Sequence, residues 1–213
     1  MTEVPPAAEA IFGDRLELAE RYVRLLATDG IEFGLIGPRE RDRLWDRHIL
    51  NCAVVAELIN FGSSTPRLVD VGSGAGLPGL VLAILRPELT VQLVEPLERR
   101  TRFLADAVKS LKLEGQVEVV RGRANDKAVV AATGSVGWVT ARAVAPLNRL
   151  AGWCLPLLRR GGSLLALKGV NAPTEILSHA DEIQQMGAMT PELVYCGTDL
   201  LDDPVRVVVV RRR

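Results

Sequence analysis

Residues 68–85 read LVDVGSGAGLPGLVLAIL, in which an apolar run passes through a glycine-rich turn into a second apolar run. The turn holds four glycines, Gly72, Gly74, Gly76 and Gly79. Closely spaced glycines let the backbone turn sharply and let a ligand approach it. The last three also match the G-x-G-x-x-G pattern of dinucleotide-binding turns, which is a weak match when taken alone. We therefore expect a buried strand, a ligand-binding turn and a helix that begins near Pro78.

Short β-branched runs alternate with helical segments throughout the C-terminal two thirds of the chain. The predicted strands are 67–71, 90–95, 116–122, 138–143, 163–169, 190–196 and 205–211, and the predicted helices are 78–85, 97–111, 146–158 and 173–186. Strands connected by helices form a parallel sheet with helices on both faces. The last two strands, joined by the short loop 197–204, should form a hairpin with one antiparallel strand at the edge of the sheet. The pattern predicts an α/β fold with a seven-stranded, mostly parallel sheet, an arrangement more typical of methyltransferases than of dehydrogenases.

The first 62 residues carry no strand pattern. Apolar residues recur at near-helical spacing over 9–29 and over about 38–60. The turn-rich segment GSSTP, residues 62–66, then separates this region from the first strand. We expect a helical extension, residues 1–62, packed on a core, residues 63–213, as one structural domain.

The composition argues against several classes of protein. Twenty-six basic and 26 acidic residues cancel, whereas a protein that grips bare nucleic acid by its phosphates usually carries a basic excess. The three cysteines lie far apart and there are only two histidines, so we expect reduced thiols and no metal site. No apolar run approaches the roughly 20 residues that span a bilayer, and the first residues do not resemble a secretory signal. We expect a cytoplasmic protein that does not contact membranes.

Two acids at strand ends discriminate between cofactors. Asp70 lies just before the glycine turn, where a carboxylate would repel the pyrophosphate of a nicotinamide dinucleotide. S-adenosylmethionine instead presents an ammonium and a sulfonium, which a carboxylate tolerates or holds through water. Glu95 ends the second strand, 19 residues after Gly76, where it can accept hydrogen bonds from both ribose hydroxyls. Asp70 therefore favours S-adenosylmethionine as the cofactor.

The third, fourth and fifth strands end in further candidate site residues. Asn125 lies in RGRAND, residues 121–126, at the position where such enzymes often bind adenine. Arg142 ends the fourth strand and Lys168 ends the fifth. Open α/β sheets bind ligands at the carboxyl ends of their strands, so these side chains are candidates for ligand contact, with surface ion pairs as the alternative.

Six segments together resemble the small-subunit ribosomal RNA guanine-N7 methyltransferase family, formerly called the glucose-inhibited division protein B family. They are WDRHILNCAVV, DVGSGAGLPG, LVEPLERRTRFL, RGRAND, ARAVAPL and LALKG, in this order, and the resemblance covers roughly residues 10–210. It implies a Rossmann-like fold of the class I S-adenosylmethionine-dependent methyltransferases. The implied substrate is N7 of a guanosine in the 530 loop of bacterial 16S rRNA. We expect the 30S subunit or its precursor as the partner of a monomeric enzyme.

The resemblance also assigns roles to individual residues. It implies cofactor contacts at Gly72, Leu77, Glu95, Ala124, Asn125 and Arg142, and the residues of the turn add Asp70, Ser73 and Gly74 as expected cofactor-binding residues. The expected RNA-binding residues are Arg47, His48 and Arg123, with a hydrogen-bonded core histidine as the alternative for His48. We assign Arg142 and Lys168 as the catalytic pair that orients the guanine or its neighbouring phosphates. Many relatives have an acid in place of Asn125 and a serine in place of Cys52, which leaves the affinity for adenine open.

Guanine N7 carries an unprotonated lone pair, so its methylation requires no base, and positioning supplies most of the rate. Other functions are compatible with the same residues. A methyltransferase for a small molecule would build its substrate pocket from the N-terminal helices. A non-catalytic ribosome assembly factor would keep the cofactor fold without turnover. A dehydrogenase is the third alternative, and Asp70 argues against it.

Overall fold

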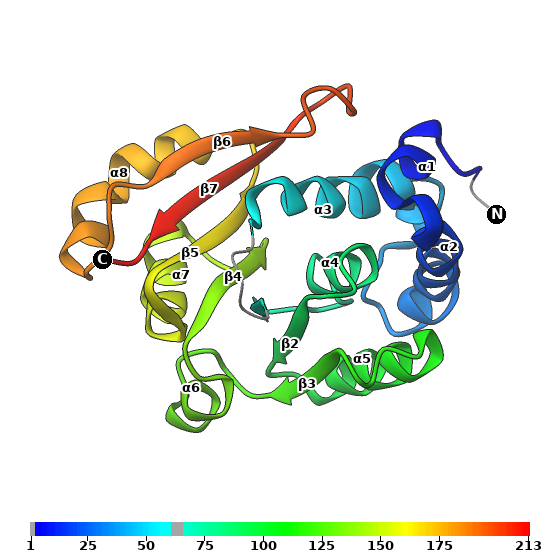
Figure 1. Ribbon diagram of the computed structural model, residues 1–213, viewed down its shortest axis with the longest axis horizontal. Helices are drawn as coiled ribbons and strands as arrows, with labels where there is room; N and C mark the ends of the chain where they lie inside the picture. The colour runs from blue at the N-terminus through cyan, green and yellow to red at the C-terminus, as the bar shows by residue number, and fades with distance from the viewer. Residues whose placement is uncertain (1–2, 61–65) are drawn as a thin grey trace.

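The computed structural model describes residues 3–60 and 66–213, and its strands form one seven-stranded sheet in the order β3-β2-β1-β4-β5-β7-β6 (Figure 1). The strands are β1 (Arg67–Val71), β2 (Thr90–Glu95), β3 (Val117–Arg121), β4 (Val136–Arg142), β5 (Leu158–Lys168), β6 (Glu192–Cys196) and β7 (Val205–Arg211). The first five strands pair in parallel, and β7 runs antiparallel to both of its neighbours. The predicted α/β fold with a mostly parallel sheet is confirmed.

The C-terminal hairpin forms as predicted, but its antiparallel strand does not lie at the edge of the sheet. β7 inserts between β5 and β6, so that β6 is the edge strand. The side chains explain this order, because Val207, Val208 and Val210 of β7 are fully buried and cover both faces of the strand. A strand that is apolar on both faces belongs inside a sheet. In β6, by contrast, Tyr195 is about half exposed.

Helices cover both faces of the sheet. They are α1 (Pro6–Phe12), α2 (Leu16–Leu25), α3 (Leu50–Ala53), α4 (Gly79–Leu85), α5 (Glu98–Leu111), α6 (Lys127–Thr133), α7 (Leu147–Cys154) and α8 (Ala172–Gln185). The core falls into two clusters because side chains alternate along each strand. Leu68 and Leu165 pack with α1 to α5, whereas Val69 and Leu164 pack with α6, α7 and α8. Figure 1 shows the same division, with α2 to α5 gathered on one side and α6 to α8 on the other.

The N-terminal region is helical, as predicted, but consists of short pieces. A break at Gly13, whose φ is +47°, separates α1 from α2, and a π-helical turn, Leu26–Gly30, follows α2. The second predicted helix is built from η3 (Pro38–Arg43), η4 (Leu44–Ile49), α3 and η5 (Val54–Leu58), which alternate between 3-10, π and α geometry. Most of the predicted linker, residues 62–66, and the boundary at residue 62 lie outside the described residues. The buried side chains of this region join the same apolar cluster as β1 and β2.

Helix α6 was not predicted. Its seven residues, KAVVAAT, are too short to display a helical period, and only Val129 and Thr133, one turn apart, are buried. Within the described parts of the chain, no helix is long and apolar enough to cross a membrane.

Candidate active site

A cavity of about 560 Å³ opens where four of the parallel strands end. Its walls are the turn after β1, residues 94–97 at the end of β2, the loop 122–125 after β3 and residues 142–144 at the end of β4. The N-terminal region closes the remaining side with residues 35–37, Glu40 and His48. Ligands bind at this edge of open α/β sheets, so the cavity is the candidate active site.

The glycine turn is held in place by backbone hydrogen bonds. The N–H groups of Gly72 and Ser73 donate to the carbonyl oxygen of Val94 in β2, at 2.8 and 3.3 Å. At the start of α4, a Cβ on Gly79 would lie 2.4 Å from Leu93 Cδ2, so only glycine fits there. Gly72, Ser73, Gly74 and Leu77 all line the cavity.

Asp70 lies beneath the turn rather than in the cavity wall. Its side chain is fully buried, and Oδ1 accepts a hydrogen bond from Thr140 Oγ1 at 2.8 Å while Oδ2 accepts one from Gly79 N–H at 3.2 Å. Burial raises the pKa of this carboxyl from 3.8 to about 6, and its hydrogen bonds oppose the rise. The carboxylate therefore braces the turn against α4 and β4, whereas we expected it to face the cofactor. Thr140, its partner across the β1–β4 pairing, had no distinctive sequence signal.

Glu95 is placed as predicted, at the end of β2 and in the cavity wall. It is 1% exposed, and its two oxygens accept hydrogen bonds from the N–H groups of Gly74 and Leu97, each at 3.0 Å. Arg100 lies 3.8 Å from the same carboxylate. These donors hold the carboxylate at the rim of the turn, where its remaining lone pairs can accept from a ligand.

The loop after β3 brings three predicted residues to the cavity. Arg123, Ala124 and Asn125 all line it, with Ala124 buried and the other two exposed. Asp126 fixes the loop, because its Oδ2 accepts a hydrogen bond from the backbone N–H of Arg123 at 2.9 Å.

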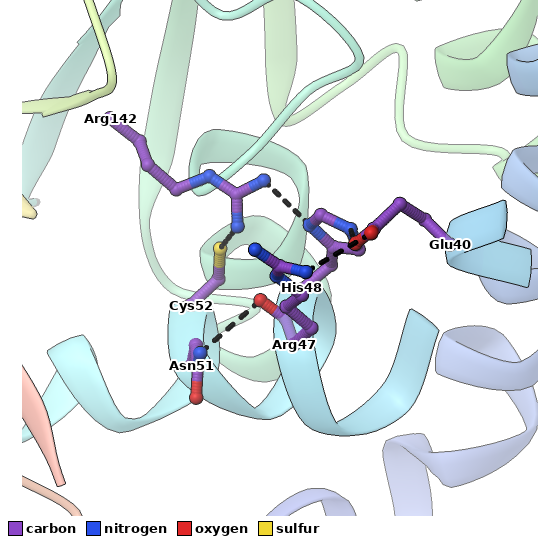
Figure 2. Close-up of polar contacts among 6 residues, drawn as sticks. All are labelled: Glu40, Arg47, His48, Asn51, Cys52 and Arg142. Atoms are coloured by element: carbon purple, nitrogen blue, oxygen red, sulfur yellow. Dashed lines mark hydrogen bonds and ion pairs between the residues drawn. The ribbon is translucent and has the colours of Figure 1, made fainter. Parts of the chain in front are cut away.

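Arg142 reaches from the end of β4 to the N-terminal region (Figure 2). Its Nη2 lies 2.7 Å from His48 Nδ1, and its Nη1 lies 3.7 Å from Cys52 Sγ. His48 Nε2 lies 3.1 Å from Glu40 Oε2, and Glu40 Oε1 accepts a hydrogen bond from Arg47 Nη1 at 3.1 Å. Burial raises the pKa of the Cys52 thiol to about 11, so this sulfur is uncharged.

The residues predicted to bind RNA do not all share one environment. Arg47 has a half-exposed side chain that does not line the cavity, whereas His48 lines it and is only 13% exposed. Sequence reasoning missed Glu40, which lies in an arginine-rich segment that resembles a solvated face. Glu40 precedes Arg47 by seven residues and His48 by eight, which is about two helical turns. This spacing is the sequence signal that could have identified Glu40 as their partner.

Lys168 does not lie where its predicted catalytic role requires. Its Nζ donates to the carbonyl oxygen of Ala145 at 2.8 Å and to Glu175 Oε2 at 2.7 Å, and it does not line the cavity. The same Glu175 oxygen accepts a hydrogen bond from the N–H of Leu147, at the start of α7, at 2.9 Å. Lys168 and Glu175 thus clamp the loop between β4 and α7, which follows Arg142.

The N-terminal region also contacts the glycine turn directly. Tyr22 of α2 is fully buried and donates a hydrogen bond from its hydroxyl to the carbonyl oxygen of Ala75 at 2.6 Å. Burial raises the pKa of Tyr22 well above its ordinary value, so the hydroxyl keeps its proton. In the sequence, Tyr22 falls within the apolar helical repeat of residues 9–29 and has no further signal.

Comparison with known proteins agrees with the family resemblance. A family model described as rRNA small subunit methyltransferase G matches residues 15–201. Ribosomal RNA small subunit methyltransferase G of Salinispora arenicola is 55% identical over 215 residues, covering 99% of this chain and 87% of that protein. The protein of the same name from Mycobacterium marinum is 52% identical over 206 residues, covering 97% of this chain and 88% of its own length.

A solved structure shows the same fold. Fibrillarin of Aeropyrum pernix with bound S-adenosyl-L-methionine superimposes with a TM-score of 0.56 at 18% identity, covering 78% of this chain and 76% of that one. The predicted class I methyltransferase fold and S-adenosylmethionine as the cofactor are both confirmed. With a family model that spans most of the chain and relatives at this identity, the chain belongs to the rRNA small subunit methyltransferase G family.

Proposed function

We propose that this methyltransferase transfers the methyl group of S-adenosylmethionine to N7 of one guanosine in the 530 loop of 16S rRNA. The substrate in this proposal is the 30S subunit or its precursor, and the enzyme acts as a monomer. The observation that carries the proposal is the convergence of the glycine turn, Glu95, Asn125 and Arg142 on one cavity. Family membership supports an rRNA substrate, because the relatives are named for methylation of small-subunit rRNA.

The residues that line the cavity fit the cofactor. Glu95 offers carboxylate oxygens for the ribose, the backbone of residues 72–74 offers a glycine-lined surface, and Asn125 and Ala124 can bind adenine. Bound S-adenosylmethionine supplies an electrophilic methyl group on its sulfonium. Asp70 contributes indirectly in this assignment, by bracing the turn from beneath.

The state of the proton acceptors in the cavity favours N7 as the target atom. Among the described residues, the proton acceptors that line the cavity are Glu40, His48 and Glu95. Glu40 and His48 are hydrogen-bonded to each other, and Glu95 is assigned to the ribose, so none of the three is assigned to remove a proton from the substrate. Guanine N7 has no proton to lose, so correct placement of its lone pair is sufficient. Arg142 can orient the base by donating to guanine O6, which leaves N7 free.

Exposed arginines in the cavity wall can contact RNA phosphates. Arg100 has a side chain that is 44% exposed, and Arg123 is also exposed. With a formal net charge of zero, phosphate contacts alone would give weak binding. This balance supports a folded ribosomal particle as the substrate, recognised partly by its shape.

The test measures transfer of labelled methyl groups. Purified protein is incubated with methyl-tritiated S-adenosylmethionine and either undermethylated 30S particles, free 16S rRNA or a small-molecule pool. Borohydride and aniline cleavage then maps N7-methylguanosine. We expect label at one guanosine, with particles preferred over free rRNA, and an Arg142→Ala variant that loses about 100-fold in rate.

The matched control for Arg142→Ala is Arg24→Ala, which removes an exposed arginine of α2 paired with Glu20, and it should keep the wild-type rate. Label confined to small molecules would identify a small-molecule methyltransferase. Cofactor binding without any transfer would identify a non-catalytic assembly factor.

A further inference from the structure

A chain of four side chains links the N-terminal region to the end of β4. Arg142 contacts His48 Nδ1, His48 Nε2 contacts Glu40, and the second oxygen of Glu40 accepts from Arg47. Figure 2 shows His48 between Arg142 on one side and Glu40 on the other. Arg142 and His48 are 94 residues apart in the sequence, so the contact depends on the packing of the N-terminal region against the sheet.

The chemistry of the three groups fixes the proton on His48. An arginine guanidinium can only donate, so Nδ1 of His48 must be the unprotonated acceptor. The remaining ring proton is then on Nε2, which donates to Glu40 Oε2. A doubly protonated ring would point an N–H at the guanidinium and lose this contact. The protein favours the neutral ring, because burial and the charge of Arg142 lower the pKa of His48 while Glu40 opposes the shift.

We propose that Glu40 is a positioning residue that acts through neutral His48 to hold the Arg142 guanidinium at the cavity wall. The inference rests on the proposed function, in which Arg142 orients the target base. It gives His48 a role inside the protein in place of the RNA contact expected from the sequence. Arg142 keeps N–H groups for a substrate, since it has five donors and only two guanidinium nitrogens are engaged.

His48 is the dominant partner of Arg142 among the described contacts. The Cys52 thiol lies 3.7 Å from Nη1, and an uncharged thiol is a weak acceptor. The imidazole contact at 2.7 Å is shorter and involves a charged donor, which makes it the stronger hydrogen bond. Loss of Glu40 should therefore release the ring, and loss of the ring should release Arg142.

Nuclear magnetic resonance of the two histidine side chains tests the geometry without any substrate. The chain contains only His48 and His179, and His179 lies on α8 outside the cavity, so it serves as an internal control. In the wild type we expect His48 as the Nε2–H tautomer at neutral pH, with a pKa below 6.5. The charged groups that act on the ring are Arg142, Glu40 and Arg47. Accordingly, Glu40→Gln should lower the pKa of His48 further and Arg142→Ala should raise it.

Kinetics tests the consequence for methyl transfer. Glu40→Gln should lower kcat about 10- to 100-fold, because a small displacement of an orienting group costs this much, with little change in KM for the cofactor. The matched control, Glu20→Gln, breaks an exposed pair with Arg24 and should keep wild-type kcat. In an Arg142→Ala background, Glu40→Gln should cost nothing further, because its effect passes through Arg142. The rate of methyl transfer should fall at low pH, when His48 becomes protonated. In Glu40→Gln this acid limb should lie at a lower pH than in the wild type, because the pKa of His48 is lower.

Separate results overturn the two proposals. A wild-type protein that methylates no RNA would refute the proposed function, while the His48 tautomer would still test the linkage. An active wild type whose Glu40→Gln variant keeps both its kcat and its acid limb would refute the positioning role. Multiplicative losses in the double variant would also refute it, because they would assign Glu40 an effect independent of Arg142. An Nδ1–H tautomer of His48 in the wild type would refute the geometry itself.

Discussion

Replacing Asp70 with asparagine should stabilise the protein at neutral pH, because it removes a buried charge while preserving the shape of the side chain. Asp70 is fully buried and accepts hydrogen bonds from Gly79 N–H and Thr140 Oγ1. An asparagine oxygen can keep the bond from Gly79, and its amide can donate to the Thr140 oxygen instead. The variant therefore loses a charge and keeps one hydrogen bond to each of the two partners.

The pKa of Asp70 sets the size of the effect. Burial raises it from 3.8 to about 6, so the folded protein binds this proton more tightly than the unfolded chain does. The stability of the wild type must then fall as pH rises through this window. Above the window the ionised carboxyl costs about 3 kcal/mol, and reorientation of Thr140 costs the variant about 1 kcal/mol. The net gain for Asp70→Asn at about pH 7.5 is thus about 2 kcal/mol.

Urea unfolding of the cofactor-free protein at two pH values provides the assay. At about pH 5 the ionisation cost is roughly halved, so the advantage of Asp70→Asn should almost disappear. Asp106→Asn, at an exposed position of α5, is the matched control and should show no such pH dependence. A variant that is equally stabilised at both pH values, or destabilised at about pH 7.5, would refute the reasoning. Because Asp70 lies beneath the turn, the cofactor Kd should stay within about threefold of wild type.

Two other contacts give separate predictions. Tyr22→Phe should lower the free energy of unfolding by about 1–2 kcal/mol, because it leaves a buried carbonyl of the glycine turn without its donor, and it should also weaken cofactor binding measured by calorimetry. The same change at half-exposed Tyr195 should leave both unchanged. Lys168→Met should lower kcat about tenfold by loosening the loop after Arg142, while exposed Lys109→Met has no effect. Complete loss of methyl transfer in Lys168→Met would instead restore Lys168 to the direct catalytic role expected from the sequence.

The fold was predictable because each strand and most helices have a clear local pattern. Apolar runs of five to seven residues, separated by turns, predicted six of the seven strands to within two residues. The start of β5 was wrong, because the strand begins at Leu158, five residues before the predicted start and inside the predicted helix 146–158. The short helix α6 was not predicted because only two of its seven residues are buried, which is too few to show a helical repeat. The position of β7 inside the sheet is decided by its pairing with β5, which is a property of the assembled sheet and not of the hairpin alone.

The site was predictable as a set of positions but not as a set of contacts. The carboxyl ends of parallel strands meet at one edge, so the glycine turn, Glu95 and Asn125 could be placed together from their order alone. The direction of a side chain at a strand end depends on its neighbours across the sheet. Asp70 turns to Thr140 on β4, which is 70 residues away, and Lys168 turns to Glu175 on α8, which is 7 residues away but in a different element.

The N-terminal region completes the wall of the candidate active-site cavity, and this has a consequence for the proposed specificity. Fibrillarin shares the fold over 78% of this chain at only 18% identity, and a fold does not by itself determine what is methylated. The N-terminal region faces the same cavity from the opposite side with Glu40 and His48, and it joins the apolar cluster that covers β1 and β2. Its helices therefore fold with the sheet and hold Arg142 at the same time. Changes of substrate among proteins with this sheet should then map to the segment that contacts Arg142, rather than to the turn that binds the cofactor.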